Sequence, residues 1–222
     1  GFGPAHVAAA GWVRKSDPSR FIQYEGALEH RFSLNEVEGY KKSQRPPEQL
    51  ERFTTDVVCP MYTPIDEIVK WAEWAESTEL DERPLILCEF SHAMGNSNGS
   101  MVEYFDAFHS IPALGGGFVW DWRDQGLKEI SDNGRAYWAY GGHFGDAPND
   151  ANFCINGLTD PEGIPHPALS EFAWSSRPVT VVRGDGPYIV ISNRRSFEDL
   201  SDLLCRWELL INGEVFNSGI LD

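Results

Sequence analysis

Three segments of the chain repeat apolar residues at helical spacing. Residues 64–78 begin with Pro64, contain no further proline and place an apolar residue every three or four positions. Residues 4–15 have a proline near the first turn and end on basic residues, and residues 100–111 gather apolar side chains on one side. We therefore predict three helices.

Between these helices the apolar residues form short runs that are typical of strands. The run at 83–90, RPLILCEF, is almost continuously apolar at its centre, as in a parallel strand buried on both faces. Runs at 21–26, 55–62 and 115–122 predict three more strands, and the polar stretch 28–53 predicts a long surface excursion. The alternation of helix and strand indicates an α/β fold with a parallel sheet.

The pattern changes after about residue 175. Residues 179–193 and 203–219 predict strands joined by Gly-Asp-Gly and Asn-Gly turns, which are hairpin signals. The roughly 45 residues present are too few for a β-sandwich of ~100 residues. We therefore divide the chain into an α/β domain at 1–176 and the N-terminal part of a β-sandwich domain at 177–222, which we expect to continue further.

Composition narrows the classes of partner. The formal net charge is −16, which repels phosphate backbones, so we expect no nucleic-acid partner. No apolar run approaches the ~18 residues of a membrane span, so we expect no membrane partner. The four cysteines lack C-x-x-C spacing, which disfavours a zinc site and favours reduced thiols and a cytoplasmic location.

Polar and aromatic residues gather where the predicted strands end. They are Glu25, Tyr62, Glu89, Trp120 and Asp121. In a (β/α)₈ barrel these ends meet at the catalytic face, and paired carboxylates in an aromatic pocket suit glycoside hydrolysis. Glu89 is the first candidate for the nucleophile. Glu25 and Asp121 are both candidates for the second carboxylate, although the position of Asp121 between two tryptophans favours a structural role.

Several motifs of the sequence resemble those of one known protein family. The stretches LILCEFSHAMGNSNG, GGFVWDWRDQGL, YGGHFGDAPNDANFCINGL and HPALSE resemble the bacterial β-galactosidases of glycoside hydrolase family 2, in the family's order. The resemblance implies that the predicted strands are strands five to eight of a (β/α)₈ TIM barrel. It also implies that an incomplete immunoglobulin-like β-sandwich follows the barrel.

The resemblance implies a retaining glycosidase that releases terminal non-reducing β-D-galactose from β-galactosides such as lactose. Glu89 matches the nucleophile, which forms a covalent galactosyl-enzyme intermediate. The family's acid/base glutamate lies in a Gly-Asn-Glu-Ser motif that ends just before Gly1, so it is expected upstream of this chain. Glu25, on strand five, is then not the acid/base, and the chain alone is expected to be inactive.

Further residues match individual positions of the family's active site. Tyr62 matches an active-site tyrosine that contacts the nucleophile. His92 matches a ligand of the sugar hydroxyls, and Phe90 and Ser91 belong to the same substrate-lining segment. Trp120 matches the aromatic floor under the galactosyl ring.

The resemblance also implies metal ions and an assembly. The backbone carbonyl of Phe153 and the side chain of Asn156 match sodium ligands, with Asn156 close to the sugar as well. Asn149 matches a contributor to a second magnesium site, and the main magnesium ligands are expected outside this chain. The full-length family members imply a homotetramer. One departure is His143, where the family often has an acidic residue.

Two other interpretations stay open. The first is a related β-glucuronidase or β-mannosidase on the same barrel, although a glucuronidase should pair the sugar carboxylate with a cation. The second is a non-catalytic or complementing sugar-binding fragment, because half a barrel leaves sheet edges unpaired.

Overall fold

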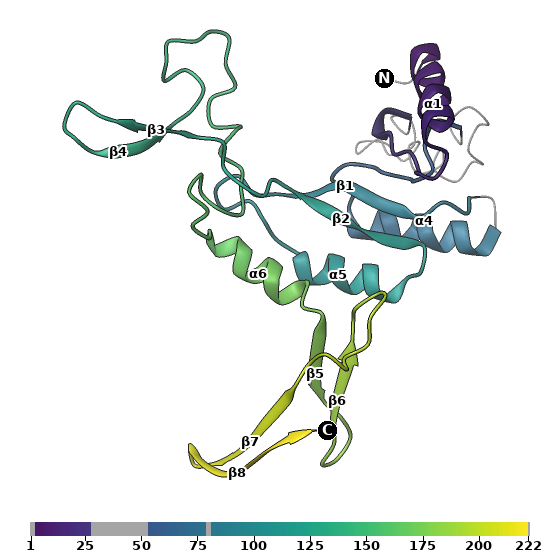
Figure 1. The fold of residues 1–222 in the computed structure, drawn as a ribbon, viewed down its shortest axis with the longest axis vertical. Coiled ribbons are helices and arrows are strands. Elements are labelled where there is room, and N and C mark those ends of the chain that lie inside the picture. Colours follow the sequence, from purple (N-terminus) through teal and green to yellow (C-terminus); the bar gives the residue numbers. More distant parts are fainter. Residues whose placement is uncertain (1–2, 28–52, 79–80, 222) are drawn as a thin grey trace. The chain divides into compact units, whose positions relative to one another are not determined.

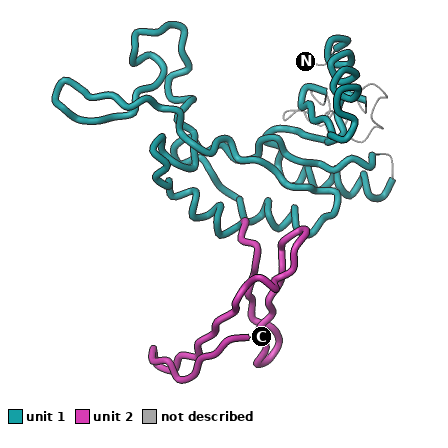
Figure 2. The backbone as a smooth tube through the Cα atoms, in the orientation of Figure 1, with its two compact units in different colours: residues 1–175 teal, residues 176–222 magenta. Residues whose placement is uncertain are grey.

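The computed structural model describes residues 3–27, 53–78 and 81–221. The chain divides into two compact units, Gly1–Ser175 and Ser176–Asp222, coloured separately in Figure 2. The first unit holds all the predicted site residues. The predicted excursion at 28–53 lies almost wholly outside the described residues.

The core of the first unit forms around one strand pair. Strand β1 (Leu85–His92) runs parallel to β2 (Leu114–Trp120), with Leu85 opposite Leu114 and His92 opposite Trp120. The helices α4 (Ile65–Thr78) and α5 (Met101–Ser110) lie beside this pair (Figure 1). The buried cluster joins side chains from all four elements and from residues 57–59, so the predicted helix–strand alternation is confirmed here.

Helix α4 shows why its sequence is helical. Its buried residues are Ile68, Trp71, Ala72 and Ala75, which repeat at the helical period and form one apolar face. The opposite face carries Lys70, which pairs with Asp66 one turn earlier. Burial of this one face holds the helix against β1.

The predicted strand at 55–62 forms only in part. Val58 pairs with Leu85 and Met61 pairs with Glu89, both in the parallel sense, as isolated bridges. Pro60 lies between the two bridges and has no N–H to donate, which breaks the ladder. The segment still follows β1 closely, because the amide of Cys88 donates to the carbonyl of Pro60 at 3.2 Å.

The prediction of a strand at 21–26 is wrong. Helix α1 (Pro4–Ser16) forms as predicted, but residues 21–24 join no sheet and Glu25–Ala27 is a short 3₁₀ turn, η1. The amide of Ile22 donates to the Asp56 carboxylate at 2.7 Å, and that of Tyr24 to the Thr55 hydroxyl at 3.3 Å. Polar side chains therefore take the donors that a strand would use.

Three further elements follow β2, and the sequence patterns predicted none of them. Strands β3 (Leu127–Ile130) and β4 (Ala136–Ala139) form an antiparallel hairpin, and α6 (Pro167–Ser175) ends the unit. Among the described residues every sheet has two strands and none closes on itself. The structure thus shows a mixed α/β arrangement with small open sheets. In the described ranges no helix combines the length and apolarity that crossing a membrane requires.

The second unit consists of two antiparallel hairpins, as the turn signals predict. Strand β5 (Val179–Arg183) pairs with β6 (Ile189–Asn193), and β7 (Cys205–Ile211) pairs with β8 (Glu214–Leu221). Asn212 and Gly213 have φ angles of 53° and 86°, as a tight Asn-Gly hairpin turn requires.

Candidate active site

Glu89 and Tyr62 meet on neighbouring parallel segments. Glu89 lies inside β1, which continues to His92, so the prediction that this strand ends at Glu89 is wrong. The amide of Tyr62 donates to the carbonyl of Glu89 at 2.7 Å. The Glu89 carboxylate also acts on the phenol of Tyr62, whose pKa it raises. The backbone hydrogen bond therefore places the predicted tyrosine beside the predicted nucleophile, within electrostatic reach of it.

The environment keeps the phenol of Tyr62 protonated. Burial raises the pKa of Tyr62 well above its usual range, and the neighbouring Glu89 carboxylate raises it further. A neutral phenol can donate a hydrogen bond to a carboxylate at neutral pH. The Tyr62 phenol is thus available as a donor beside the Glu89 carboxylate.

Tyr62 occupies a rare backbone conformation. Its φ is 48°, in the left-handed region that bulky residues avoid, at a cost of ~1–3 kcal/mol. Such a conformation persists only where the surroundings fix it, and it is found most often at functional sites.

Aromatic rings continue the site beyond Tyr62. His92, at the end of β1, lies 6.2 Å from the Tyr62 ring at an interplanar angle of 90°. The Phe153 ring lies 6.1 Å from the His92 ring. Three predicted site residues from distant parts of the sequence therefore form one row, with Phe153 exposed.

Trp120 stands at the end of the neighbouring strand. It is the last residue of β2, pairs with His92 in the strand register and is 41% exposed. Its carbonyl accepts the amide of Ala93 at 2.7 Å. The strand pair therefore holds its backbone and leaves the indole open to a ligand.

The side chains of Phe90 and Ser91 turn inward. Phe90 is buried in the core, where its ring lies 5.1 Å from that of Tyr104. Ser91 is also buried, and its hydroxyl accepts the side-chain amide of Asn98 at 2.8 Å. The structure does not bring these two side chains into the aromatic row.

The two candidates for a second carboxylate have different surroundings. Both carboxylate oxygens of Asp121 accept local hydrogen bonds, one from the amide of Trp122 and one from the side chain of Gln125 at 3.0 Å. This favours the structural role expected for Asp121. Glu25 lies in η1 and acts electrostatically on the thiols of Cys59 and Cys88.

The predicted sodium ligands adjoin each other. Asn156 is fully buried and its Nδ2 donates to the carbonyl of Phe153 at 2.7 Å. Its Oδ1 is also buried and has no hydrogen-bond partner. Rotation of the amide would place two oxygens together, as a hard cation requires. The buried oxygen without a partner fits a cation ligand.

Asn149 does not fit the predicted magnesium site in its present arrangement. Its Nδ2 donates to the carbonyl of Asp146 at 2.9 Å and its Oδ1 accepts the amide of Ala151 at 3.1 Å. Both polar atoms are thus used inside the exposed loop. Within the described residues, no group of three or more His, Cys, Asp or Glu side chains could hold a metal ion.

A buried acidic residue that contacts Gly157, next to Asn156, was not identified from the sequence. Asp124 is buried, and its carboxylate accepts the amide of Gly157 at 2.6 Å and contacts His166 at 2.9 Å. A Cβ on Gly157 would collide with the backbone of Arg123 and Asp124. Gly157, the residue after Asn156, is therefore held in place by Asp124.

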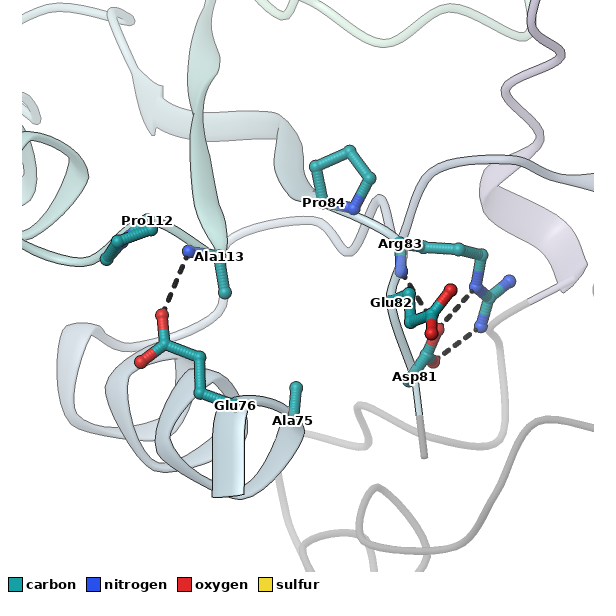
Figure 3. A pocket seen from close by; sticks show the side chains of 8 residues that line it. All are labelled: Ala75, Glu76, Asp81, Glu82, Arg83, Pro84, Pro112 and Ala113. Atoms are coloured by element: carbon teal, nitrogen blue, oxygen red, sulfur yellow. Dashed lines mark hydrogen bonds and ion pairs between the residues drawn. The ribbon is translucent and has the colours of Figure 1, made fainter. Parts of the chain in front are cut away.

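One pocket lies at the opposite end of the strand pair. It has a volume of about 350 Å³ and is lined by residues that precede β1 and β2 or belong to α4 (Figure 3). The guanidinium of Arg83 forms two bonds of 2.9 and 2.8 Å with the buried Asp81. None of the predicted site residues lines this pocket. Its ion pair secures the amino end of β1.

Comparison with known proteins defines the class. The family model described as "Glycosyl hydrolases family 2, TIM barrel domain" matches residues 1–181. The chain therefore belongs to glycosyl hydrolase family 2, and this segment is part of its TIM barrel domain.

Several curated relatives of this chain are β-galactosidases. A β-galactosidase from Aeromonas hydrophila is 41% identical over 229 residues, which cover 99% of this chain and 20% of that protein. One from Photobacterium profundum is 39% identical over 231 residues, with the same coverage. One from Yersinia enterocolitica is 45% identical over 179 residues, covering 77% and 15%.

These comparisons confirm the resemblance seen in the motifs. The chain spans about a fifth of the length of the first two of these relatives. Among solved structures, a family 2 β-galacturonidase from Eisenbergiella tayi aligns with 56% of the chain at 18% identity and a TM-score of 0.36, which carries no further argument.

Proposed function

We propose that this chain is the nucleophile-bearing part of a retaining β-galactosidase. The backbone hydrogen bond that places Tyr62 beside Glu89, together with the effect of the Glu89 carboxylate on the Tyr62 phenol, carries this proposal. The similarity to β-galactosidases along nearly the whole chain supports β-galactosides, such as lactose, as the substrate class.

In the first step, Glu89 attacks the anomeric carbon of a terminal galactose, the aglycone leaves, and a covalent galactosyl-enzyme forms. An acid/base glutamate protonates the leaving oxygen and later activates water. We propose that a part of the complete gene product outside this chain supplies this group, because the oxygens of Asp121 are used locally and Glu25 lies in η1.

Tyr62 acts on the second step. When water releases galactose, Glu89 leaves the anomeric carbon and regains its negative charge. The neutral phenol donates a hydrogen bond to that developing charge, which lowers the barrier. The raised pKa keeps this proton on Tyr62 throughout the working pH range.

The remaining residues bind and orient the sugar. Trp120 offers an exposed aromatic face for the apolar side of a galactosyl ring. His92 presents a ring nitrogen to the sugar hydroxyls, between Tyr62 and Phe153. Phe90 and Ser91 shape the site through the backbone of β1, because their side chains are buried.

We propose a sodium site at the Phe153 carbonyl and Asn156 Oδ1, where these uncharged oxygens would coordinate the ion near a sugar hydroxyl. For magnesium, Asn149 would first have to give up its loop bonds. A cytoplasmic location remains a prediction from the cysteines, and the main magnesium ligands and a homotetrameric assembly remain predictions from the family. So do strands five to eight of the closed barrel at 1–176 and the immunoglobulin-like sandwich at 177–222.

The test uses the complete gene product that contains these residues. We expect it to hydrolyse an aryl β-D-galactoside and Glu89→Gln to lower kcat by at least ~10⁴-fold, because the nucleophile is lost. The matched control is Glu103→Gln, at an exposed position of α5, with unchanged kcat. Equal activity of the Glu89→Gln protein would sink the proposal.

The related glycosidases are distinguished by substrate. The candidate site has no Lys or Arg to pair a sugar carboxylate. Its residues are Tyr62, Glu89, His92, Trp120 and Phe153. We therefore expect turnover of the aryl β-galactoside to exceed that of the β-glucuronide and the β-mannoside. The reverse order would support one of those activities instead.

A further inference from the structure

The conformation of Tyr62 needs support on both sides. On one side, its amide donates to the carbonyl of Glu89 at 2.7 Å. On the other side, Thr63 is completely buried, and its carbonyl accepts the phenol of Tyr104 at 2.9 Å. Tyr104 belongs to α5 and is 41 positions away in the sequence. A helix therefore fixes the residue that follows the strained tyrosine.

Tyr104 also contacts the residue that follows Glu89. Its ring lies 5.1 Å from that of Phe90 and 6.1 Å from that of Phe108. One side chain thus touches the next residue after each member of the Tyr62–Glu89 pair, Thr63 through the phenol and Phe90 through the ring.

The surroundings of Tyr104 favour the protonated phenol that this hydrogen bond needs. Burial, and then the charge of Asp66, raise the pKa of the Tyr104 phenol. The phenol therefore keeps its proton, and the buried carbonyl of Thr63 keeps its donor. Loss of that donor would leave a buried acceptor unsatisfied.

We propose that Tyr104 is a positioning residue for the Tyr62–Glu89 pair. Its phenol holds the backbone after Tyr62, so that the Tyr62 side chain stays directed at the Glu89 carboxyl group. Tyr104 itself touches neither sugar nor reacting atoms. The inference rests on the proposed function, because it gives the pair its catalytic meaning.

The variant Tyr104→Phe separates the phenol from the ring. It keeps the packing against Phe90 and Phe108 and removes only the bond to Thr63. In the complete gene product we expect kcat for an aryl β-galactoside to fall about five- to ten-fold, as loss of one buried hydrogen bond would give. KM should change less than kcat, since substrate contacts remain.

A double-mutant cycle shows whether Tyr104 acts through Tyr62. In a Tyr62→Phe background, Tyr104→Phe should lower kcat by less than about two-fold, because the group it positions is already gone. The matched control is Tyr188→Phe, at a side chain that is 73% exposed in the second unit, with no change. An equal loss in both backgrounds, or no loss in either, would overturn the proposal.

A second readout does not depend on turnover. The Tyr62 amide should exchange with solvent several-fold faster in Tyr104→Phe than in the parent, while the amides of β3 and β4 exchange alike. Unchanged exchange at Tyr62 contradicts the proposed positioning even if activity falls. If the parent hydrolyses no β-galactoside but this exchange difference appears, the proposed function fails and the positioning stands.

Discussion

Strands β1 and β7 are both rich in leucine and isoleucine, yet their surroundings differ. Leu85 and Leu87 of β1 are completely buried, whereas Leu209 and Leu210 of β7 are 49% and 55% exposed. β1 has a parallel partner on each side and packs in a core with α4 and α5, while β7 pairs only with β8 among the described residues.

Different interactions therefore determine the two regions. In the first unit, long-range burial holds the strand that carries Glu89. In the second unit of this 222-residue chain, local turns and pairing hold strands whose apolar side chains are largely exposed. Core truncation should therefore damage the first unit, and turn substitution should damage the second.

We expect the largest effect from a substitution in the core of the first unit. In the 222-residue chain, Leu87→Ala should lower the free energy of unfolding of the first unit by ~2–5 kcal/mol, because it leaves a cavity. The matched change Leu210→Ala should stay within about 0.5 kcal/mol. Hydrogen exchange of β1 and β7 amides measures both. Similar losses at the two positions would erase the contrast.

A turn substitution tests the second unit. Gly213 has φ +86° and Gly99 has no positive φ, and neither has a neighbour within 4 Å of an added Cβ. Gly213→Ala should therefore cost the β7–β8 hairpin ~1–2 kcal/mol through backbone strain alone. Gly99→Ala should cost almost nothing. Equal exchange of β7–β8 amides in the two variants would show that the turn does not determine the hairpin.

A smaller effect concerns the polar attachment of α1. Burial raises the pKa of the Asp56 carboxyl group, but hydrogen bonds from Arg14 and the Ile22 amide outweigh it and lower the pKa overall. A lowered folded-state pKa stabilises above the unfolded value near 3.8, and this stability is lost as the pH falls through the folded value. Asp56→Asn should remove about 1 kcal/mol at pH 7 and flatten the acid limb.

The control for that effect is an exposed ion pair. Asp66→Asn breaks the exposed bond to Lys70 on α4 and removes a charge that also acts on the Tyr104 phenol, and it should cost ~0.3–0.5 kcal/mol. Unfolding curves from pH 7 to pH 2 give both values. An acid limb that Asp56→Asn leaves unchanged would show that this carboxylate does not link α1 to the core.

Local patterns predicted much of the fold. The three helices and both hairpins of the second unit appear where spacing and turn residues place them. The strand at 21–26 failed because side chains of Thr55 and Asp56, distant in sequence, take its donors. The β3–β4 hairpin was missed because each of its strands has only four residues, although Asn133 and Gly134 between them form a turn signal that could have revealed it.

The residues of the candidate site could be predicted only in part. Glu89, Tyr62, His92 and Trp120 carry recognisable motifs and lie at the strand pair. Tyr104 could not be found, because its phenol donates to a backbone carbonyl and leaves no pattern in side-chain types. The inward direction of Phe90 and Ser91 depends on how β1 packs between layers, which spacing along the chain does not specify.

The most direct measurement asks which carboxylate carries the sugar. The complete gene product is incubated with an activated 2-deoxy-2-fluoro-β-galactoside, which slows release of the glycosyl-enzyme, and is then digested and mapped by mass spectrometry. We expect one galactosyl adduct, on Glu89, and none in the Glu89→Gln protein. An adduct on Glu25, Asp121 or any other residue would contradict the assignment of Glu89 as the nucleophile.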